Sequence, residues 1–327
     1  MLEELDLDRA GSQSANKTKD FKPMTRKQML RVAERLPQAM VKVTSYASGM
    51  SSAMATAKYV NRDGDLPMET DDGYILTSMD EVNENLDEWG HDFGERKNSR
   101  DTMHLVLSTP SDSDRIATHR AIRAFAGEVF SDNHSYMFAI HNDTDNPHGH
   151  FIVKMRGHDG VKLDPRKQDL KRWREVFAEK CREQGIEVEA SPRLARGVGT
   201  KGGKQGTKLA AIKAKERGES SSFQAGLRGA VADAWGELQK TGGFTLKAWE
   251  KRAKEVTRYF KDLYRSEATK IDTEAKAVSG EDKEALEQQA EKLRAFADSL
   301  PEPKSLREQS VEHIQSVQSK GSKDIER

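Results

Sequence analysis

The chain has 327 residues, of which 35% are hydrophobic and 33% are charged, and its formal net charge at pH 7 is zero. This length allows two domains, and the polar composition indicates that part of the chain is solvated helix or disordered tail. The single cysteine, Cys181, excludes an intramolecular disulfide and every cysteine-based zinc module. There is neither an apolar run of about 18 residues nor a signal-peptide pattern, so we expect a cytoplasmic protein without membrane insertion.

The charges are segregated along the chain. Residues 69–101 contain 11 acidic residues against 3 lysines and arginines, whereas residues 191–218 contain 8 lysines and arginines against one acid. Local charge decides where a phosphate backbone can bind. The zero net charge therefore does not exclude a nucleic-acid partner.

The hydrophobic pattern predicts an α+β domain with an antiparallel sheet, followed by a helical region. Strands are predicted at residues 40–46, 73–77, 102–109, 135–141 and 148–155. Helices are predicted at residues 25–36, 51–60, 79–97, 113–130 and 167–185. We expect a mostly disordered or helical leader at 1–38, the α+β domain at 39–198, a basic linker at 199–222 and a helical C-terminal region at 223–327.

Residues 141–150 read HNDTDNPHGH, and their histidines have the spacing of a metal site. His148 and His150 leave the same face of a strand, and His141 ends the preceding strand. Three imidazoles can thus converge on one divalent ion and leave positions open for water or substrate, which is typical of a catalytic site. Asp143 shares the parity of His141 and is the better candidate, ahead of Asp145, for orienting an imidazole.

The simplest alternative to a metal site is three unrelated histidines in a loop and a strand. Nucleotide hydrolases with a His-x-His-x-His site would need a third histidine where this chain has Ile152. His104, within the strand predicted at 102–109, could lie near the cluster across the sheet, although an ordinary sheet histidine is the simpler interpretation.

Tyr59 is a reasonable candidate for a nucleophile, with Lys58 and Arg62 beside it to hold a phosphate, but the residues alone do not rank it first. Spacing alone favours a core aromatic residue on an amphipathic helix at this position. Tyr46 and Tyr74 are weaker candidates because each lies in a strand-like pattern.

The run HNDTDNPHGHFIV resembles the metal-binding motif of HUH-type relaxases in the mobilisation and T-DNA border nuclease group. That motif, His-x-Asp-x-x-x-Pro-His-x-His, is met at His141, Asp143, Pro147, His148 and His150. The segment KYVNRDGDLPME is similar to the nucleophile segment of the family, and MHLVLSTP is similar to the strand beside its metal hairpin. The resemblance covers about residues 40–200.

The resemblance implies a five-stranded antiparallel sheet with flanking helices, and it identifies Tyr59 and Asp143 as catalytic residues. A divalent metal, Mg or Mn, would be held by His141, His148 and His150, although such donors also suit Zn or Ni. Tyrosine would nick single-stranded origin-of-transfer DNA, stay on the 5′ phosphate and pilot the strand into a recipient cell. A relaxosome accessory protein and a type IV coupling protein would be its partners in the bacterial cytoplasm.

The basic residues near these motifs are candidates for DNA binding. They are Lys58, Arg62, Lys154, Arg156, Arg166 and Lys167. Two alternatives to a conjugative relaxase stay open: a rolling-circle replication initiator with the same chemistry, and a nonenzymatic DNA-binding or secretion adaptor. Formation of a covalent adduct with an origin oligonucleotide distinguishes the adaptor from the enzymes.

Overall fold

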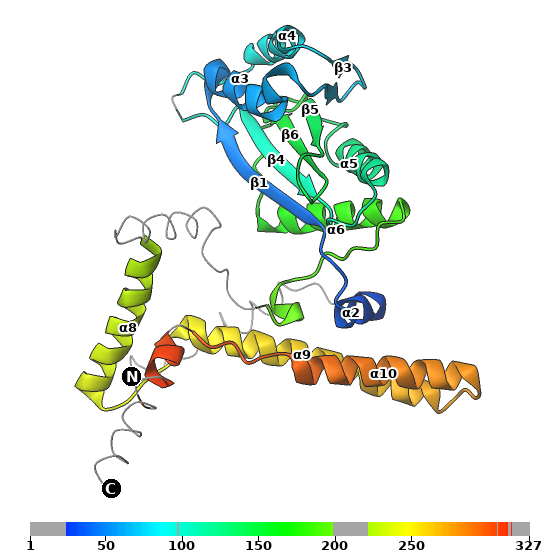
Figure 1. Cartoon of the computed structure of the whole chain (residues 1–327), viewed down its shortest axis with the longest axis vertical. Coiled ribbons are helices and arrows are strands. Elements are labelled where there is room, and N and C mark those ends of the chain that lie inside the picture. The colour runs from blue at the N-terminus through cyan, green and yellow to red at the C-terminus, as the bar shows by residue number, and fades with distance from the viewer. Residues whose placement is uncertain (1–23, 97, 199–221, 306, 313–314, 316–327) are drawn as a thin grey trace, which may run out of the picture. The chain divides into compact units, whose positions relative to one another are not determined.

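The computed structural model describes residues 24–96, 98–198, 222–305, 307–312 and 315 (Figure 1). The chain divides into two compact units. One is Glu34–Ser191, the sheet unit, and the other combines Met1–Ala33 with Pro192–Arg327, the helical unit. The predicted disordered arm and nearly all of the basic linker at 199–222 lie outside the described residues. The sequence-based boundaries at 38 and 198 stay predictions.

The sheet unit contains a six-stranded antiparallel sheet in the order β1-β4-β6-β5-β2-β3. Its strands are β1 (Met40–Ala47), β2 (Met68–Thr70), β3 (Ile75–Leu76), β4 (Thr102–Ser108), β5 (Tyr136–His141) and β6 (His148–Lys154). The predicted α+β class with an antiparallel sheet and a helical C-terminal region is confirmed. The strand that the sequence pattern missed is β2, a three-residue strand that is too short to show an alternating pattern.

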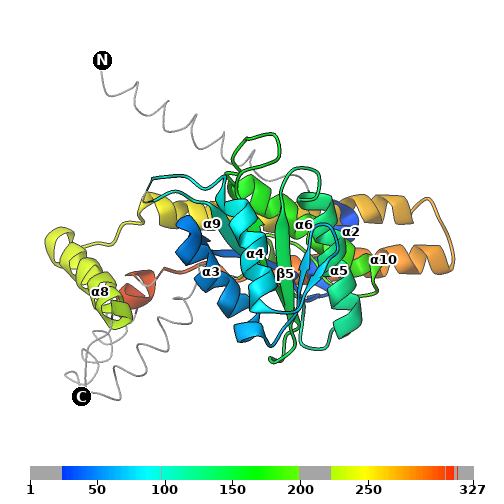
Figure 2. The same ribbon diagram turned by 90° about the horizontal axis from the view of Figure 1, so that it is seen from above.

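Helices cover both faces of this sheet (Figure 2). The helices α5 (Arg115–Val129) and α6 (Lys167–Glu183) pack on the face where Phe138 and Phe151 stack, with ring centroids 4.9 Å apart. The helices α3 (Gly49–Val60) and α4 (Met79–Gly90) pack on the opposite face. Successive side chains of a strand point to opposite faces, so each central strand contributes to both hydrophobic layers. This explains why the central strands are mostly apolar in sequence.

The start of α3 is held by a buried carboxylate. Asp101, just before β4, accepts hydrogen bonds from the backbone nitrogens of Gly49 at 2.8 Å and Gly94 at 3.0 Å. Hydrogen bonds to a carboxylate are stronger than neutral ones, because the acceptor is charged. The bond from Gly49 fixes the start of α3 to the start of β4, and α3 carries Tyr59 in its last turn.

Backbone hydrogen bonds join the two ends of the sheet unit. The nitrogen of Ala39 donates to the carbonyl of Glu189 at 3.0 Å, and the nitrogen of Glu189 donates to the carbonyl of Pro37 at 2.9 Å. Gln38 forms a parallel bridge with Glu189, and its side-chain oxygen accepts from the nitrogen and hydroxyl of Ser191. We call these paired segments, residues 37–39 and 189–191, the stem.

The helical unit includes α8 (Ser222–Thr241), α9 (Ala248–Ala275) and α10 (Glu281–Ser299), together with α2 (Arg26–Ala33) from the start of the chain. One hydrophobic cluster contains Met29 and Val32 of α2, Phe260 of α9 and Leu293 of α10. Arg26 donates to Glu267 at 2.8 Å and to both carboxylate oxygens of Glu274 at 2.7 Å. The first described helix is therefore packed against helices more than 200 residues further along the chain.

The segment that follows the sheet unit also packs into the helical unit. The short helix η3 (Leu194–Arg196) lies against α9, where the buried hydroxyl of Tyr264 donates to the carbonyl of Ala195 at 2.9 Å. None of the described helices is both long enough and apolar enough to cross a membrane.

Candidate metal and nucleophile site

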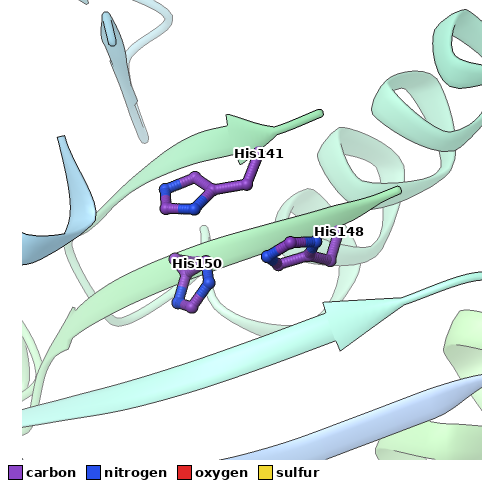
Figure 3. Close-up of side chains that lie close together, drawn as sticks. All are labelled: His141, His148 and His150. Atoms are coloured by element: carbon purple, nitrogen blue, oxygen red, sulfur yellow. The ribbon is translucent and has the colours of Figure 1, made fainter. Parts of the chain in front are cut away.

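The three histidines of the motif lie together at one end of the central strands (Figure 3). His141 ends β5 and pairs directly with His148 at the start of β6, and His150 lies two residues further along the same face. Their potential ligand atoms all lie within 4.8 Å of one another. The predicted hairpin therefore brings the imidazoles to the distances that one shared ion requires.

Each imidazole has one ring nitrogen engaged by a neighbouring group. Nε2 of His141 donates to the Val60 carbonyl at 2.7 Å, and Nδ1 of His148 donates to the Asn146 carbonyl at 2.9 Å. Nδ1 of His150 lies 2.9 Å from Nε2 of His104. Metal-binding histidines typically use one nitrogen for the ion and the other for such a hydrogen bond. The donor set thus fits a divalent ion bound by Nε2 of His148 and His150 and by Nδ1 of His141. Nη2 of Arg62 lies 3.2 Å from that Nδ1, so Arg62 must release it when the ion binds.

Burial keeps the inner imidazoles neutral. Burial, together with a smaller effect of the neighbouring ring of His141, lowers the pKa of His150 to about 3. Burial also lowers the pKa of His141, against a hydrogen bond to Val60 that raises it. Only neutral imidazole has a free lone pair, so both rings are ready to bind a metal at neutral pH.

Tyr59 lies next to this cluster, at the end of α3. Its ring meets those of His150 and His104 edge-on, with centroid separations of 5.7 and 6.0 Å, and its side chain is 54% exposed. Tyr74 is 71% exposed beside β3, and Tyr46 packs beneath the guanidinium of Arg100. Of the three tyrosines considered from the sequence, Tyr59 is the one that the structure brings to the histidines.

The turn after Tyr59 places Arg62 beside the cluster. Nη2 of Arg62 donates to Asp143 at 2.5 Å and to Nδ1 of His141 at 3.2 Å. Arg62 and Asp63 have φ angles of 57° and 62°, a left-handed conformation that costs roughly 1–2 kcal/mol for each non-glycine residue. Such strain is often retained at functional sites. Asp143, predicted to orient an imidazole, is linked to His141 through Arg62.

The predicted DNA-binding cations fall into two groups. Lys58 and Arg62 lie near Tyr59, and each is paired with a carboxylate, Lys58 with Asp63 at 3.0 Å. Lys154 ends β6, roughly 20 Å from His148 at the usual rise of a strand. Its side chain is 12% exposed and pairs with Asp92 at 2.5 Å.

Arg156, Arg166 and Lys167 follow Lys154 in the chain, away from the histidines. Arg156 donates to the carbonyl of Gly160 at 3.0 Å, Arg166 pairs with Asp164, and Lys167 is exposed at the start of α6. The structure brings Lys58 and Arg62 close to the histidine cluster, but it does not bring these three cations there. Any contact of these three residues with DNA would therefore involve nucleotides distant from the one at Tyr59.

Two further contacts belong to the site. The first overturns the simpler interpretation of His104 as an ordinary sheet histidine, and the second was not expected from the sequence. His104 lies in contact with His150, and Arg115 at the start of α5 donates to the carbonyl of Asn142 at 2.5 Å. The position of His104 inside a strand was a signal for the first, because β4 was predicted correctly. The sequence held no signal for the second.

Residues 59–186 match the family model described as "Relaxase: MobA/VirD2-like, nuclease domain". This segment is similar to the nuclease domain of MobA/VirD2-like relaxases. The match begins at Tyr59 and includes the three histidines of the cluster, His104, and Arg62. After this similarity we refer to the sheet unit, Glu34–Ser191, as the relaxase domain.

Curated relatives align with less than half of the chain. The T-DNA border endonuclease VirD2 of Agrobacterium fabrum is 27% identical over 161 residues, which cover 43% of this chain and 36% of that protein. VirD2 of Rhizobium radiobacter is 29% identical over 161 residues, with 43% and 38% covered. A solved structure described as "Molecular Basis of Vancomycin Resistance Transfer in Staphylococcus aureus" is 17% identical, covers 47% of this chain and 99% of its own, and has a TM-score of 0.35. The chain thus spans little more than a third of the length of the VirD2 relatives.

Proposed function

We propose that this chain is a relaxase that nicks one DNA strand at an origin of transfer, with Tyr59 as the nucleophile. The observation that carries the proposal is the contact of the exposed Tyr59 ring with His150, one of three clustered imidazoles whose potential ligand atoms lie within 4.8 Å of one another. A nucleophile and a phosphate-polarising group must act on the same phosphate, so they must lie side by side.

In the proposed reaction the phenolate oxygen of Tyr59 attacks the scissile phosphorus. The tyrosine O–P bond forms while the P–O3′ bond breaks, and the phenol proton has left to solvent. The 5′ phosphate stays on Tyr59, and the 3′ oxygen takes up a proton to become a free hydroxyl. The number of phosphoester bonds is unchanged, so the reverse reaction reseals the strand without ATP.

His141, His148 and His150 would hold a divalent metal ion, which when bound supplies a Lewis acid that polarises the scissile phosphate. We propose Mg or Mn, although imidazole donors also suit Zn or Ni. Arg62 and Lys58 would contact the phosphate by charge-assisted hydrogen bonds. In the DNA-free structure Arg62 is paired with Asp143 and Lys58 with Asp63. DNA binding would replace these carboxylates with phosphate oxygens. Before DNA binds, Arg62 links Asp143 to His141.

We further propose that the substrate is single-stranded origin DNA, and that the protein pilots the nicked strand through a type IV channel. A relaxosome accessory protein and a type IV coupling protein would be partners in the bacterial cytoplasm before transfer. The resemblance to VirD2, described as a T-DNA border endonuclease, supports this proposal.

The test is covalent capture of an oligonucleotide. The full chain is incubated with Mn²⁺ and single-stranded DNA from the inverted repeat next to its gene, and adducts are resolved under denaturing conditions. Wild type and Tyr74→Phe, which changes an exposed tyrosine outside the cluster, should form the adduct, whereas Tyr59→Phe should not. An adduct on Tyr59→Phe would contradict the nucleophile assignment. Absence of any wild-type adduct would favour a nonenzymatic adaptor.

A further inference from the structure

His104 and His150 form a buried pair on the face of the sheet that carries the site. Their side chains are on neighbouring strands, with Nε2 of His104 2.9 Å from Nδ1 of His150. In the register of β4 and β6, His104 pairs with Ile152 and Val106 pairs with His150, so the two histidines are diagonal neighbours. Diagonal pairs lie within reach of long and aromatic side chains. The residues are 8% and 6% exposed, so each relies on the other for a hydrogen bond.

Counting hydrogens shows which imidazole must donate. A neutral imidazole carries one N–H and one lone pair. If His104 donated, the proton of His150 would lie on Nε2, and that nitrogen could not bind a metal. If His150 donates from Nδ1, its Nε2 lone pair is free to bind a metal. Metal binding by Nε2 of His150 therefore requires Nε2 of His104 to accept the hydrogen bond.

The backbone around His104 is also restrained. The pairing register of β1 and β4 shifts between Val43 and Ser45, which leaves Thr44 as the extra residue of a β-bulge. The hydroxyl of Thr44 donates to the carbonyl of His104 at 3.0 Å. Bulges frequently lie next to active sites, where they direct a side chain. This bulge brings Ser45 opposite His104 and fixes the strand at the residue that contacts His150.

We propose that His104 is a positioning residue for the metal site: it accepts a hydrogen bond from Nδ1 of His150 and thereby fixes the tautomer and ring orientation that present Nε2 to the ion. The proposal rests on the metal-binding part of the proposed function and is independent of the nicking step. His104 lies outside the set of clustered ligand atoms formed by the other three histidines, so it acts through His150.

The experiment measures Mn²⁺ affinity of the full chain by the electron paramagnetic resonance of free Mn²⁺. His104→Leu, which lacks an acceptor, should bind Mn²⁺ 10–100-fold more weakly, as is usual when the partner of a metal-binding histidine is lost. His104→Gln, whose side-chain oxygen can accept from His150, should recover most of the affinity. His134→Leu is the matched control, because His134 is an equally buried histidine that contacts the Lys154 carbonyl at the other end of the sheet. It should bind Mn²⁺ as wild type does.

A second measurement uses the wild type alone, so its result does not depend on whether a variant folds. Long-range ¹H–¹⁵N NMR of the metal-free wild type should show His150 as the Nδ1–H tautomer. The Nε2–H tautomer, unchanged affinity in His104→Leu, or lack of Mn²⁺ binding by wild type would each overturn the proposal. Metal binding that depends on His104 without adduct formation at Tyr59 would instead contradict only the nicking function.

Discussion

Replacing His148 with alanine should remove most of the stabilisation that Mn²⁺ gives to the relaxase domain. His148 is the least buried of the three proposed ligands, and Nδ1 donates to a loop carbonyl at Asn146. His141 and His150 are buried between strands and α3, so their loss would also destabilise the metal-free protein. His148→Ala therefore isolates the contribution of the metal.

The size of the effect follows from binding linkage. At free Mn²⁺ of about 100 times the dissociation constant, the ion stabilises the wild-type domain by about 2.7 kcal/mol. A domain of this size shifts by roughly 2–4 °C for each kcal/mol, so Tm should rise by about 5–11 °C. If loss of one donor weakens binding about 100-fold, the same Mn²⁺ contributes about 0.4 kcal/mol, and the shift falls to about 1 °C.

The assay is differential scanning calorimetry of the full chain, metal-free and with added Mn²⁺. His158→Ala is the control, because His158 is an exposed imidazole of the same domain whose partner is the hydroxyl of Ser135. It should keep the full shift. A wild-type shift in His148→Ala, or loss of the shift in the control, would refute the assignment of His148 as a ligand.

Three further predictions concern stability. Burial lowers the pKa of His104 to about 4 and that of His150 to about 3, so below pH 6.5 the unfolded chain binds more protons than the folded one. Urea unfolding should show the metal-free domain losing about 2 kcal/mol per imidazole between pH 7 and pH 5, and a flat profile would contradict this. Phe125→Ala should cost about 3–5 kcal/mol, since this ring is fully buried and packs edge-on against Phe177, whereas Ile116→Ala on the exposed side of α5 should cost under about 0.5 kcal/mol. Arg26→Ala should lower the Tm of the helical unit by the equivalent of about 1 kcal/mol, less in high salt, and an unchanged Tm would show that its carboxylate pairs are not stabilising.

The arrangement of the motif histidines could be predicted because their spacing and strand periodicity act over short distances. Because side chains alternate between the two faces along a strand, His148 and His150 share a face. The short loop before them must return the chain beside His141. The same local reasoning gave the strands β1, β4, β5 and β6 close to their observed bounds. It missed β2, whose three residues are held by pairing with β5 and β3.

Contacts between distant segments could not be predicted. Whether His104 reaches His150 depends on the register of β4 against β6, and a shift of one residue would place it on the other face of the sheet. Lys154 looked like an exposed cation in sequence, but its partner Asp92 follows α4, 62 residues earlier. Such pairings are decided by tertiary packing, which a single sequence does not encode in a readable pattern.

The stem has a mechanical consequence. Residues 37–39 enter the relaxase domain and residues 189–191 leave it as a parallel pair, joined by backbone hydrogen bonds between Ala39, Glu189 and Pro37. A force that pulls the two ends apart would slide these segments past each other, so the bonds would bear the load together instead of breaking in turn. The relaxase domain should therefore resist extraction through its ends more strongly than an antiparallel pair that can be unzipped one bond at a time.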